Sequence, residues 1–448
     1  MRVLLISANT LTVPYPVYPI GLDYVAGALT PAHEVRILDM NCAGFEDLKS
    51  VIDEFLPELV GISLRNIDNT DTTDPQEFME GYRRLAETVR THCRAPIVLG
   101  GAGFSIFPEK ILDTLAADYG IVGEGDHMVA LLDALAAGVS AAGLPGVVTP
   151  ERDPDPAVPA TRGPRRLFDN RSVHLDFYLR HGGMLNLQTK RGCPFRCIYC
   201  TYPHIEGRRM RLMDPSSVAD TAKALEDAGA RYFFIVDSAF NADIEHSLDV
   251  AEQFRNRGVS IPWGAFLAPL RMPGTYFDTL ARCGLTHVEF GTESLSDRVL
   301  RAYGKPFHRQ WILDAHEQAR NAGLRIAHYF LLGGPEETAE TLETTLSHID
   351  KLKKSVLFLF CGMRIYPRTP LYDRALEEGL IGPEKDLLTP FYYESPAIGR
   401  DAIITRVKDK AEGRVNWVVG SGGDEAGELV KRMYRKGYTG PLWEFLIR

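Results

Sequence analysis

The chain has 448 residues, of which 45% are hydrophobic and 24% are charged, and its formal net charge is −9. This length exceeds what one hydrophobic core usually supports, so we expect two or three domains. The acidic balance disfavours a duplex nucleic acid as partner. The longest apolar runs fall far short of the roughly 20 residues of a membrane span. An odd number of cysteines, seven, argues against a disulfide framework and for a cytoplasmic protein.

Residues 1–140 alternate short apolar segments with helical patterns. The apolar segments are rich in Val, Ile and Leu on both faces, which is typical of buried parallel strands. They span 2–8, 34–40, 59–64, 96–101 and 119–125. The segment 78–92 repeats apolar residues with helical spacing. This alternation predicts a doubly wound, Rossmann-like α/β domain whose ligand lies beyond the carboxyl ends of the strands.

Polar and glycine-rich loops follow three of these expected strands. In such loops glycine lets the backbone approach a ligand closely, and polar side chains supply hydrogen-bonding groups. The loops predict a ligand-binding surface made of Arg65, Asn66, Asp68, Asn69, Gly100, Gly101, Gly103, Gly123 and Glu124. A glycine turn after a strand is also common, so each loop taken alone is compatible with an ordinary turn.

A segment rich in proline and charge, 151–166, predicts an interdomain linker, which we extend over 141–183. From Met184 a second series of apolar strands and helices begins. Its expected strands span 184–189, 232–237, 262–267, 287–293, 325–334 and 356–367. Six such units predict a partial (β/α)6 barrel over 184–378, with its active site at the carboxyl ends of the strands. The remaining residues, 379–448, are expected to form a small mixed C-terminal region.

Three cysteines follow the first strand of the second series, in the stretch KRGCPFRCIYCTYPHIEG. Cys193, Cys197 and Cys200 have the spacing C-x3-C-x2-C. Thiolates are soft ligands suited to zinc or to iron–sulfur clusters. A structural zinc site requires a fourth ligand, for which His204 is the local candidate. A four-iron cluster held by three cysteines leaves one iron open, and we favour such a catalytic cluster over zinc.

This spacing at the end of a first barrel strand resembles the radical S-adenosylmethionine (SAM) superfamily, over about residues 184–375. The segments VDSAFN (236–241) and FGTESLSDRVLRAYGK (290–305) resemble the endings of the family's second and fourth strands. The resemblance implies that SAM is bound by Tyr199, Asp237, Asn241 and Glu293. The segment LLGGPEET (331–338) resembles the fifth-strand turn, with Glu336 where the family prefers glycine.

The resemblance also implies a chemistry. The three cysteines would hold a 4Fe–4S cluster whose open iron binds the amino and carboxylate groups of SAM. One electron passed into the sulfonium would give methionine and a 5′-deoxyadenosyl radical able to abstract hydrogen from an unactivated carbon. The electron would come from an external one-electron reductant of the flavodoxin or ferredoxin type.

The two-domain layout resembles the subset of this superfamily that has an N-terminal cobalamin-binding domain. The phrases YPIGLDYVAGAL (18–29), GGAGFSIFPEKIL (100–112) and DYGIVGEGD (118–126) are similar to that domain. The motif D-x-H-x-x-G, whose histidine ligates cobalt, is absent from the sequence. The resemblance implies cobalamin on the loops after the strands, facing the cluster, and leaves open a domain retained without a corrin.

The remaining cysteines are predicted to be structural. Cys42 and Cys93 are expected in the core, and they are too few for the second cluster of the related methylthiotransferases. Cys283 is expected in the core at the end of a helix. Cys361, on the sixth barrel strand, is favoured as a buried packing residue, and a role as a thiol inside the barrel stays open.

Three functions are compatible with these patterns. The leading one is a radical SAM enzyme that uses cobalamin to methylate an unactivated centre of a small-molecule or lipid-like substrate. The alternative keeps the radical and performs a rearrangement, cyclisation or ring contraction without methyl transfer. The third is a zinc-stabilised binding protein without catalysis. The sequence assigns no catalytic residue beyond the cofactor sites.

Overall fold

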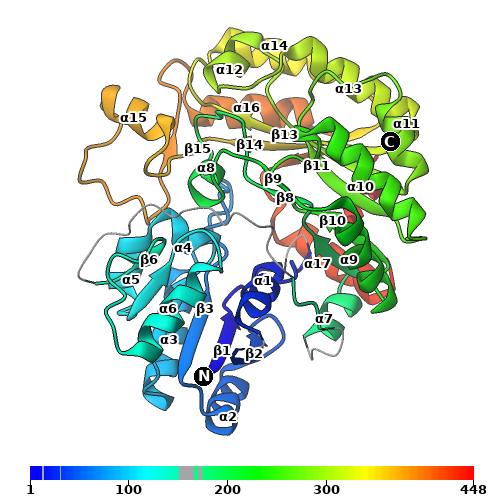
Figure 1. The fold of residues 1–448 in the computed structure, drawn as a ribbon. Helices are drawn as coiled ribbons and strands as arrows, with labels where there is room; N and C mark the ends of the chain where they lie inside the picture. Colours follow the sequence, from blue (N-terminus) through cyan, green and yellow to red (C-terminus); the bar gives the residue numbers. More distant parts are fainter. Residues whose placement is uncertain (13–14, 31, 151–165, 170–173, 448) are drawn as a thin grey trace.

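The computed structural model describes residues 1–12, 15–30, 32–150, 166–169 and 174–447. It contains two large parallel sheets, each with helices packed beside it (Figure 1). This architecture confirms the predicted α/β fold class. The segment predicted as a linker, 151–166, lies almost entirely outside the described residues. Among the helices of the described ranges, none combines the length and the apolar character of a membrane span.

The N-terminal sheet has the strand order β2-β1-β3-β4-β5-β6. Strands β1 to β5 pair in parallel, and β6 pairs antiparallel with β5, so this sheet continues past residue 140. The strands are β1 (Arg2–Ser7), β2 (Glu34–Asp39), β3 (Leu59–Ser63), β4 (Ile97–Gly100), β5 (Tyr119–Ile121) and β6 (Val147–Val148). The helices are α1 (Ile20–Leu29), α2 (Phe45–Phe55), α3 (Met79–His92), α4 (Ala102–Ile106), α5 (Pro108–Thr114) and α6 (His127–Ala137). The central strands β1 and β3 are buried almost throughout, as their continuous apolar runs predict.

The second sheet has seven parallel strands in the order β17-β14-β13-β12-β11-β10-β7. They are β7 (Met184–Leu187), β10 (Tyr232–Ile235), β11 (Trp263–Leu267), β12 (Leu285–Glu293), β13 (Arg325–Leu332), β14 (Ser355–Cys361) and β17 (Trp417–Val419). Six of them are the predicted barrel strands. The seventh, β17, comes from the region beyond residue 378, so the sheet takes up part of what we expected to be a separate C-terminal region. Its three residues are too few to show a strand pattern in the sequence.

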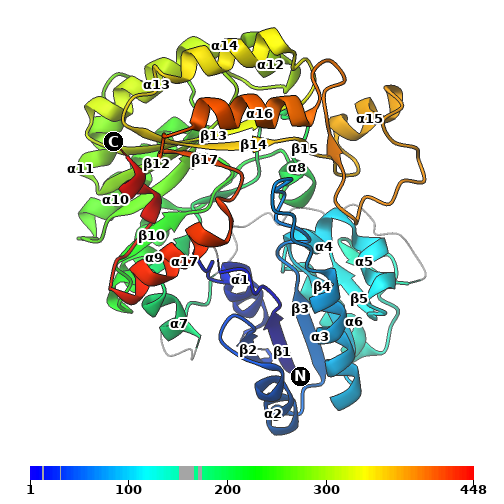
Figure 2. The same ribbon diagram turned by 180° about the vertical axis from the view of Figure 1, so that it is seen from behind.

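Helices cover the outer side of this curved sheet (Figure 2). They are α9 (Pro215–Asp227), α10 (Ile244–Asn256), α11 (Tyr276–Arg282), α12 (Asp297–Ala302), α13 (Arg309–Asn321), α14 (Ala339–Ile349) and α16 (Arg400–Ala411). Alternate strand residues, such as Phe233 and Trp263, pack against these helices in the outer apolar core. Because side chains alternate along a strand, the residues between them face the inside of the barrel.

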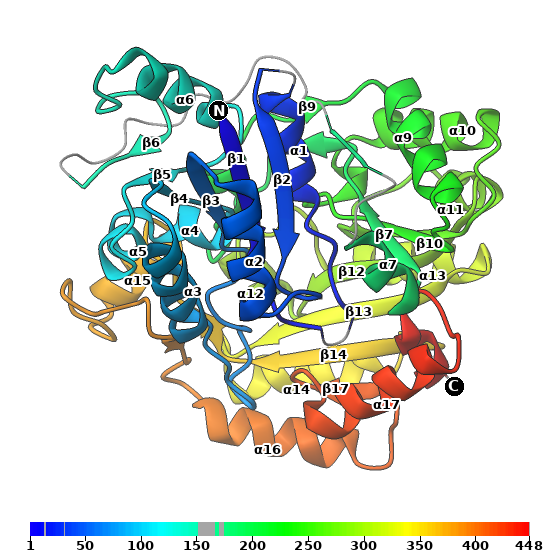
Figure 3. The same cartoon turned by 90° about the horizontal axis from the view of Figure 1, so that it is seen from below.

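The C-terminal segment crosses from the edge strand β17 to the opposite edge strand β7 (Figure 3). It contains α17 (Gly423–Arg435) and the short helix η2 (Leu442–Leu446). The Gly440 N–H donates to the Gly182 carbonyl oxygen at 2.9 Å, just before β7 begins. The Trp443 indole N–H donates to the Glu289 carboxylate at 2.9 Å, on the inner face of β12. The segment therefore covers the gap between the two edge strands at their amino ends.

One loop of the N-terminal domain, 65–77, packs on the barrel. The Asp68 carboxylate pairs with Arg364 at 3.0 Å, and both side chains are almost fully buried. The Ser421 N–H, which follows β17, donates to the Asp71 carboxylate at 2.6 Å. The Thr72 hydroxyl donates to the Cys361 carbonyl oxygen at the end of β14. These contacts join the N-terminal domain to the carboxyl ends of two barrel strands.

Candidate active site at the domain interface

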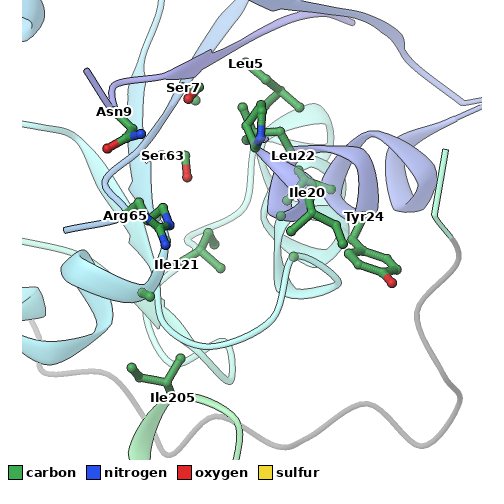
Figure 4. Close-up of a pocket in the computed structure, with 18 of the residues that line it drawn as sticks. Leu5, Ser7, Asn9, Ile20, Leu22, Tyr24, Ser63, Arg65, Ile121 and Ile205 are labelled. Carbon is green, nitrogen blue, oxygen red and sulfur yellow. The ribbon is translucent and has the colours of Figure 1, made fainter. Parts of the chain in front are cut away.

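A cavity of about 290 Å³ lies at the carboxyl ends of the N-terminal strands (Figure 4). One wall includes Ser7 and Ser63, which end β1 and β3, and Arg65 just beyond. The opposite wall comes from the barrel and includes Tyr202 and Ile205 of the short helix α8 (Tyr202–Ile205). The cavity therefore lies between the two domains, at the sheet edge where doubly wound folds bind their ligands.

The structure brings only part of the predicted ligand surface to this cavity. The predicted residues that line it are Arg65, Gly100, Gly101 and Gly123. The predicted residues that do not line it are Asn66, Asp68, Asn69, Gly103 and Glu124. For both groups a role in cofactor binding stays a prediction.

The polar side chains of the second group have partners elsewhere. Asp68 pairs with the barrel residue Arg364, and the Glu124 carboxylate pairs with the barrel residue Arg211. The Asn69 side-chain oxygen accepts the N–H groups of Asp71 and Gln76 within its own loop. In the structure these residues make interdomain and loop contacts, and a role for them in cofactor binding stays a prediction.

Gly101 occupies a turn that a side chain would disturb. Its φ is +97°, and a Cβ atom there would lie 2.6 Å from the Leu64 carbonyl oxygen. We expect Gly101→Ala to displace the β4–α4 turn and to weaken hydroxocobalamin binding by about tenfold or more, equal to ~1.4 kcal/mol. Absorbance titration measures this affinity. Gly138→Ala, at a φ of +64° with no atom within 4 Å, is the control and should bind normally; equal affinities would contradict the expectation.

The cysteine loop follows the two-residue strand β8 (Lys190–Arg191) and is tied to three other segments. The Cys193 N–H donates to the Gly207 carbonyl oxygen at 3.1 Å. The Ile198 N–H donates to the Tyr303 carbonyl oxygen at 3.1 Å, and the Ile198 carbonyl oxygen accepts the Leu371 N–H at 3.0 Å. The backbone that carries the three thiols is therefore held in place by the barrel itself.

The chemistry of the three thiols fits an iron–sulfur cluster. Burial raises the pKa of Cys197 and raises the pKa of Cys200 to about 12. A thiol that coordinates a metal loses its proton, and a cationic metal group would offset the negative charge of the resulting thiolates. Within the described ranges, no three His, Cys, Asp or Glu side chains converge on a point where a single metal ion could bind. The zinc alternative with His204 needs that convergence, whereas each cysteine of a four-iron cluster binds a different iron.

Tyr199, Glu293 and Lys305 form a buried hydrogen-bonded cluster beside the cysteine loop. The Tyr199 hydroxyl donates to Glu293 Oε1 at 2.7 Å, and Lys305 Nζ donates to the same Oε1 at 2.9 Å and to the Tyr199 hydroxyl oxygen at 2.8 Å. Burial opposes the charge on Lys305, but the charges of Glu293 and Cys197 raise its pKa. Glu293 has a φ of +62°, which is uncommon for a non-glycine residue.

Two family models match the chain. The model of the B12 binding domain matches residues 6–133, and that of the radical SAM superfamily matches residues 187–349. The chain is a radical SAM protein with a B12-binding domain. The first match covers the N-terminal wall of the cavity, and the second covers the cysteine loop and the Tyr199–Glu293–Lys305 cluster. The cofactors of these two domains are a 4Fe–4S cluster, SAM and cobalamin, as predicted.

Several relatives and solved structures are similar to this chain over most of its length. The tryptophan 2-C-methyltransferase of Streptomyces laurentii is 25% identical over 438 residues, covering 81% of this chain and 73% of the relative. The cytidylyl-2-hydroxyethylphosphonate methyltransferase of Streptomyces wedmorensis is 24% identical over 448 residues, covering 85% and 82%. The solved structure of the radical SAM methyltransferase TsrM from Kitasatospora setae superposes with a TM-score of 0.86 at 23% identity, covering 99% and 97%. This likeness confirms the fold of both domains.

Two of the residues predicted to bind SAM are held by the radical SAM domain itself. The Asp237 carboxylate accepts hydrogen bonds from the Thr189 N–H and from the Lys190 ammonium, both at 2.8 Å. The Asn241 amide is fully buried and exchanges two hydrogen bonds with the Ala268 backbone. These contacts anchor the start of the cysteine loop and the end of β11, and a role for both residues in SAM binding stays a prediction. SAM binding by Tyr199 and Glu293 also stays a prediction, and Lys305 lies in contact with both of them.

The remaining sequence predictions have mixed outcomes. Cys361 lies in the outer apolar core with Leu359, so it packs against helices instead of facing the barrel interior. Cys283 is buried at the end of α11, as predicted, whereas Cys42 is exposed and not part of the core. Glu336 adopts a φ of +65°, which explains the glycine preference there, and its carboxylate pairs with Arg298 at 2.5 Å.

The carboxylate of Glu289 lies on the inner face of β12. It is 1% exposed and accepts hydrogen bonds from the Trp443 indole N–H and from the Tyr329 hydroxyl at 2.8 Å. Burial raises the pKa of Glu289 from 4.5 to about 7. The side chain is therefore a titratable group near neutral pH, and sequence reasoning did not single it out.

The raised pKa of Glu289 makes stability depend on pH. Between pH 4.5 and about 7 the folded protein keeps a proton that the unfolded chain has lost, so the free energy of unfolding falls as pH rises. Glu289→Gln removes this proton uptake. Relative to the natural protein, the variant should gain up to ~3 kcal/mol between those two pH values. Urea unfolding at several pH values measures the gain, and parallel pH profiles would contradict it.

Proposed function

We propose that this radical SAM protein transfers a methyl group by way of cobalamin to an unactivated centre of a small molecule. The observation that carries the proposal is the position of the cavity. Its barrel wall includes Tyr202, two residues after Cys200, and its other wall belongs to the B12-binding domain. The residues suited to the two cofactors are therefore neighbours in the domain interface.

Each cofactor has a set of residues suited to hold it. The cysteines Cys193, Cys197 and Cys200 would hold the cluster. The cavity residues Arg65, Gly100, Gly101 and Gly123 would hold the corrin. When bound, these groups supply the methyl-transfer and radical chemistry that protein side chains lack.

The chain contributes position, charge and exclusion of water. Lys305 and Glu293 place a cation and an anion beside the cysteine loop, which complements the carboxylate and ammonium of the methionyl end of SAM. Both side chains are at least about nine-tenths buried, and low water content strengthens such interactions. The backbone hydrogen bonds of Ile198 with Tyr303 and Leu371 hold the cysteine loop in position beside this charged pair.

The inner face of the barrel supports a substrate with a flat or extended apolar part. Phe234 and Phe266 have ring centroids 4.9 Å apart, and Tyr329 stacks on Phe358 at 4.8 Å. Phe266 is 36% exposed although it lies on a central strand. Exposed aromatic rings inside a barrel offer contact area to an apolar ligand. The names of two relatives, tryptophan 2-C-methyltransferase and hopanoid C-3 methylase, describe substrates of this kind for those proteins.

The test uses anaerobically purified protein reconstituted with iron, sulfide and hydroxocobalamin. It is incubated with methyl-labelled SAM, a chemical reductant and a panel of indoles, porphyrins and polycyclic lipids. We expect a labelled product together with S-adenosylhomocysteine. Formation of 5′-deoxyadenosine and methionine with a rearranged, unlabelled product would instead support the radical rearrangement. A colourless protein that binds zinc would exclude both enzymes.

A further inference from the structure

The segment that carries the three cysteines is basic, although the chain as a whole is acidic. Residues 190–212 contain six Lys and Arg residues but one acidic residue, Glu206, whereas the whole chain carries a net charge of −9. Excess positive charge in one short segment of an acidic protein creates a local field of opposite sign. The partners of each cation decide whether this field reaches solvent.

Three of the six cations are neutralised inside the protein. Lys190 pairs with Asp237 at 2.8 Å, with both side chains buried. Arg211 pairs with Glu124, and Arg191 lies 3.6 Å from Glu206. These pairs hold the loop and the domain interface, and their charge does not reach a partner in solution.

The other three cations, Arg196, Arg208 and Arg209, are exposed. None of them forms an ion pair with any residue in the part of the chain that the structure describes. Arg301, exposed on α12, is likewise without an ion pair among those residues. Because unpaired exposed guanidinium groups keep their full charge, these four residues form a basic patch, which we call the arginine patch.

The four arginines of the patch lie within or next to the segments that contact the cysteine loop. Arg196 directly precedes Cys197, and Arg208 and Arg209 follow Gly207, whose carbonyl oxygen accepts the Cys193 N–H. Arg301 lies two residues before Tyr303, which bonds to the cysteine loop at Ile198. Among the acids of adjoining elements, Glu336 and Glu378 are paired with arginines, and Asp373 is exposed. Asp297, four residues before Arg301 on α12, accepts the Arg309 N–H. The positive charge of the patch is therefore only partly offset.

We propose that the arginine patch is the docking surface of an acidic one-electron carrier protein, a step that rests on the proposed function. Cys193 is buried and Cys197 and Cys200 are partly buried, so an electron must enter through the surrounding protein, and its transfer rate falls steeply with distance. A carrier seated on the patch lies close to the cysteines. The carrier would lose one electron to the metal group that the three cysteines would hold, and no covalent bond would form or break. Elsewhere the net negative surface repels an acidic carrier, so the patch also fixes its orientation.

The test measures binding of a purified flavodoxin to the reconstituted protein by biolayer interferometry. The variant R196Q/R208Q/R209Q removes three charges of the patch. We expect this variant to bind flavodoxin at least about tenfold more weakly than the natural protein, with a weaker dependence on salt. The control R94Q/R406Q/R435Q removes three exposed arginines outside the patch and should bind like the natural protein. Equal affinity of both variants would overturn the proposal, as would tighter binding of a single-stranded oligonucleotide than of flavodoxin.

A second readout separates this proposal from the proposed function. With the chemical reductant dithionite, docking is bypassed, so the patch variant should methylate as fast as the control. With flavodoxin as the electron source, it should be about tenfold slower. If the patch variant and the control methylate equally fast with flavodoxin, the docking surface is contradicted and the proposed function is not. Absence of methylation with dithionite in the natural protein contradicts the proposed function and leaves the binding result valid.

Discussion

Replacing Cys197 with serine should abolish the iron–sulfur absorbance and reduce bound iron by about tenfold or more after anaerobic reconstitution. The serine hydroxyl is a harder and far less acidic ligand, and the site supplies no fourth cysteine to replace it. Without the cluster, neither SAM cleavage nor methyl transfer should be detectable. Iron analysis, the absorbance spectrum and product analysis measure the three effects together.

The matched control is Cys42→Ser, which changes an exposed cysteine of the B12-binding domain. It should keep full iron content and normal hydroxocobalamin binding. Cys197→Ser should also keep its hydroxocobalamin binding, because the cavity does not include Cys197. Iron retained at the natural level in Cys197→Ser would contradict the three-cysteine site.

Replacing Asp68 with alanine should lower the free energy of unfolding by about 3–5 kcal/mol, because it leaves a buried Arg364 without its counter-ion. The Asp68 and Arg364 side chains are 1% and 3% exposed, and they join the two domains. Urea unfolding, followed by tryptophan fluorescence, measures the shift. Glu80→Ala, which breaks an exposed pair with Arg83 at 2.5 Å, should cost no more than ~1 kcal/mol.

The double variant D68L/R364M separates lost charge balance from lost contact. Two apolar side chains of similar volume remove the uncompensated charge, so most of the stability should return. If Asp68→Ala costs no more than Glu80→Ala, the interdomain pair contributes little. If the double variant is no more stable than Asp68→Ala, the hydrogen bonds that Arg364 donates to backbone carbonyls are the larger contribution.

The sequence was sufficient to predict most strands of the two sheets and the position of the cysteine loop. Buried parallel strands give continuous apolar runs, and the tight spacing of Cys193, Cys197 and Cys200 restricts the possible ligands. Both signals are local in the chain, so they need no knowledge of tertiary contacts. The resemblance of the same segments to a known superfamily then supplied Tyr199 and Glu293.

What the sequence could not predict is the partners of polar residues when those partners are distant in the chain. Asp68 and Asp237 lie after apolar strands, where ligand residues are expected, yet each is bound to a cation of the barrel. Their partners, Arg364 and Lys190, could not be recognised without the fold. Lys305 was missed for the same reason, because a lysine after a glycine usually indicates a solvent-exposed turn. Only its burial beside Glu293 shows otherwise.

The loop 65–77 makes the two domains poor candidates for independent exchange. A chimera that takes its B12-binding domain from another protein would bring a foreign loop to the ends of β14 and β17. The Arg364 site and the Ser421 N–H would then lose the partners that Asp68 and Asp71 provide. In an engineered hybrid, the unit to transplant with the barrel therefore includes this loop, and the cut between donor sequences belongs within the N-terminal sheet.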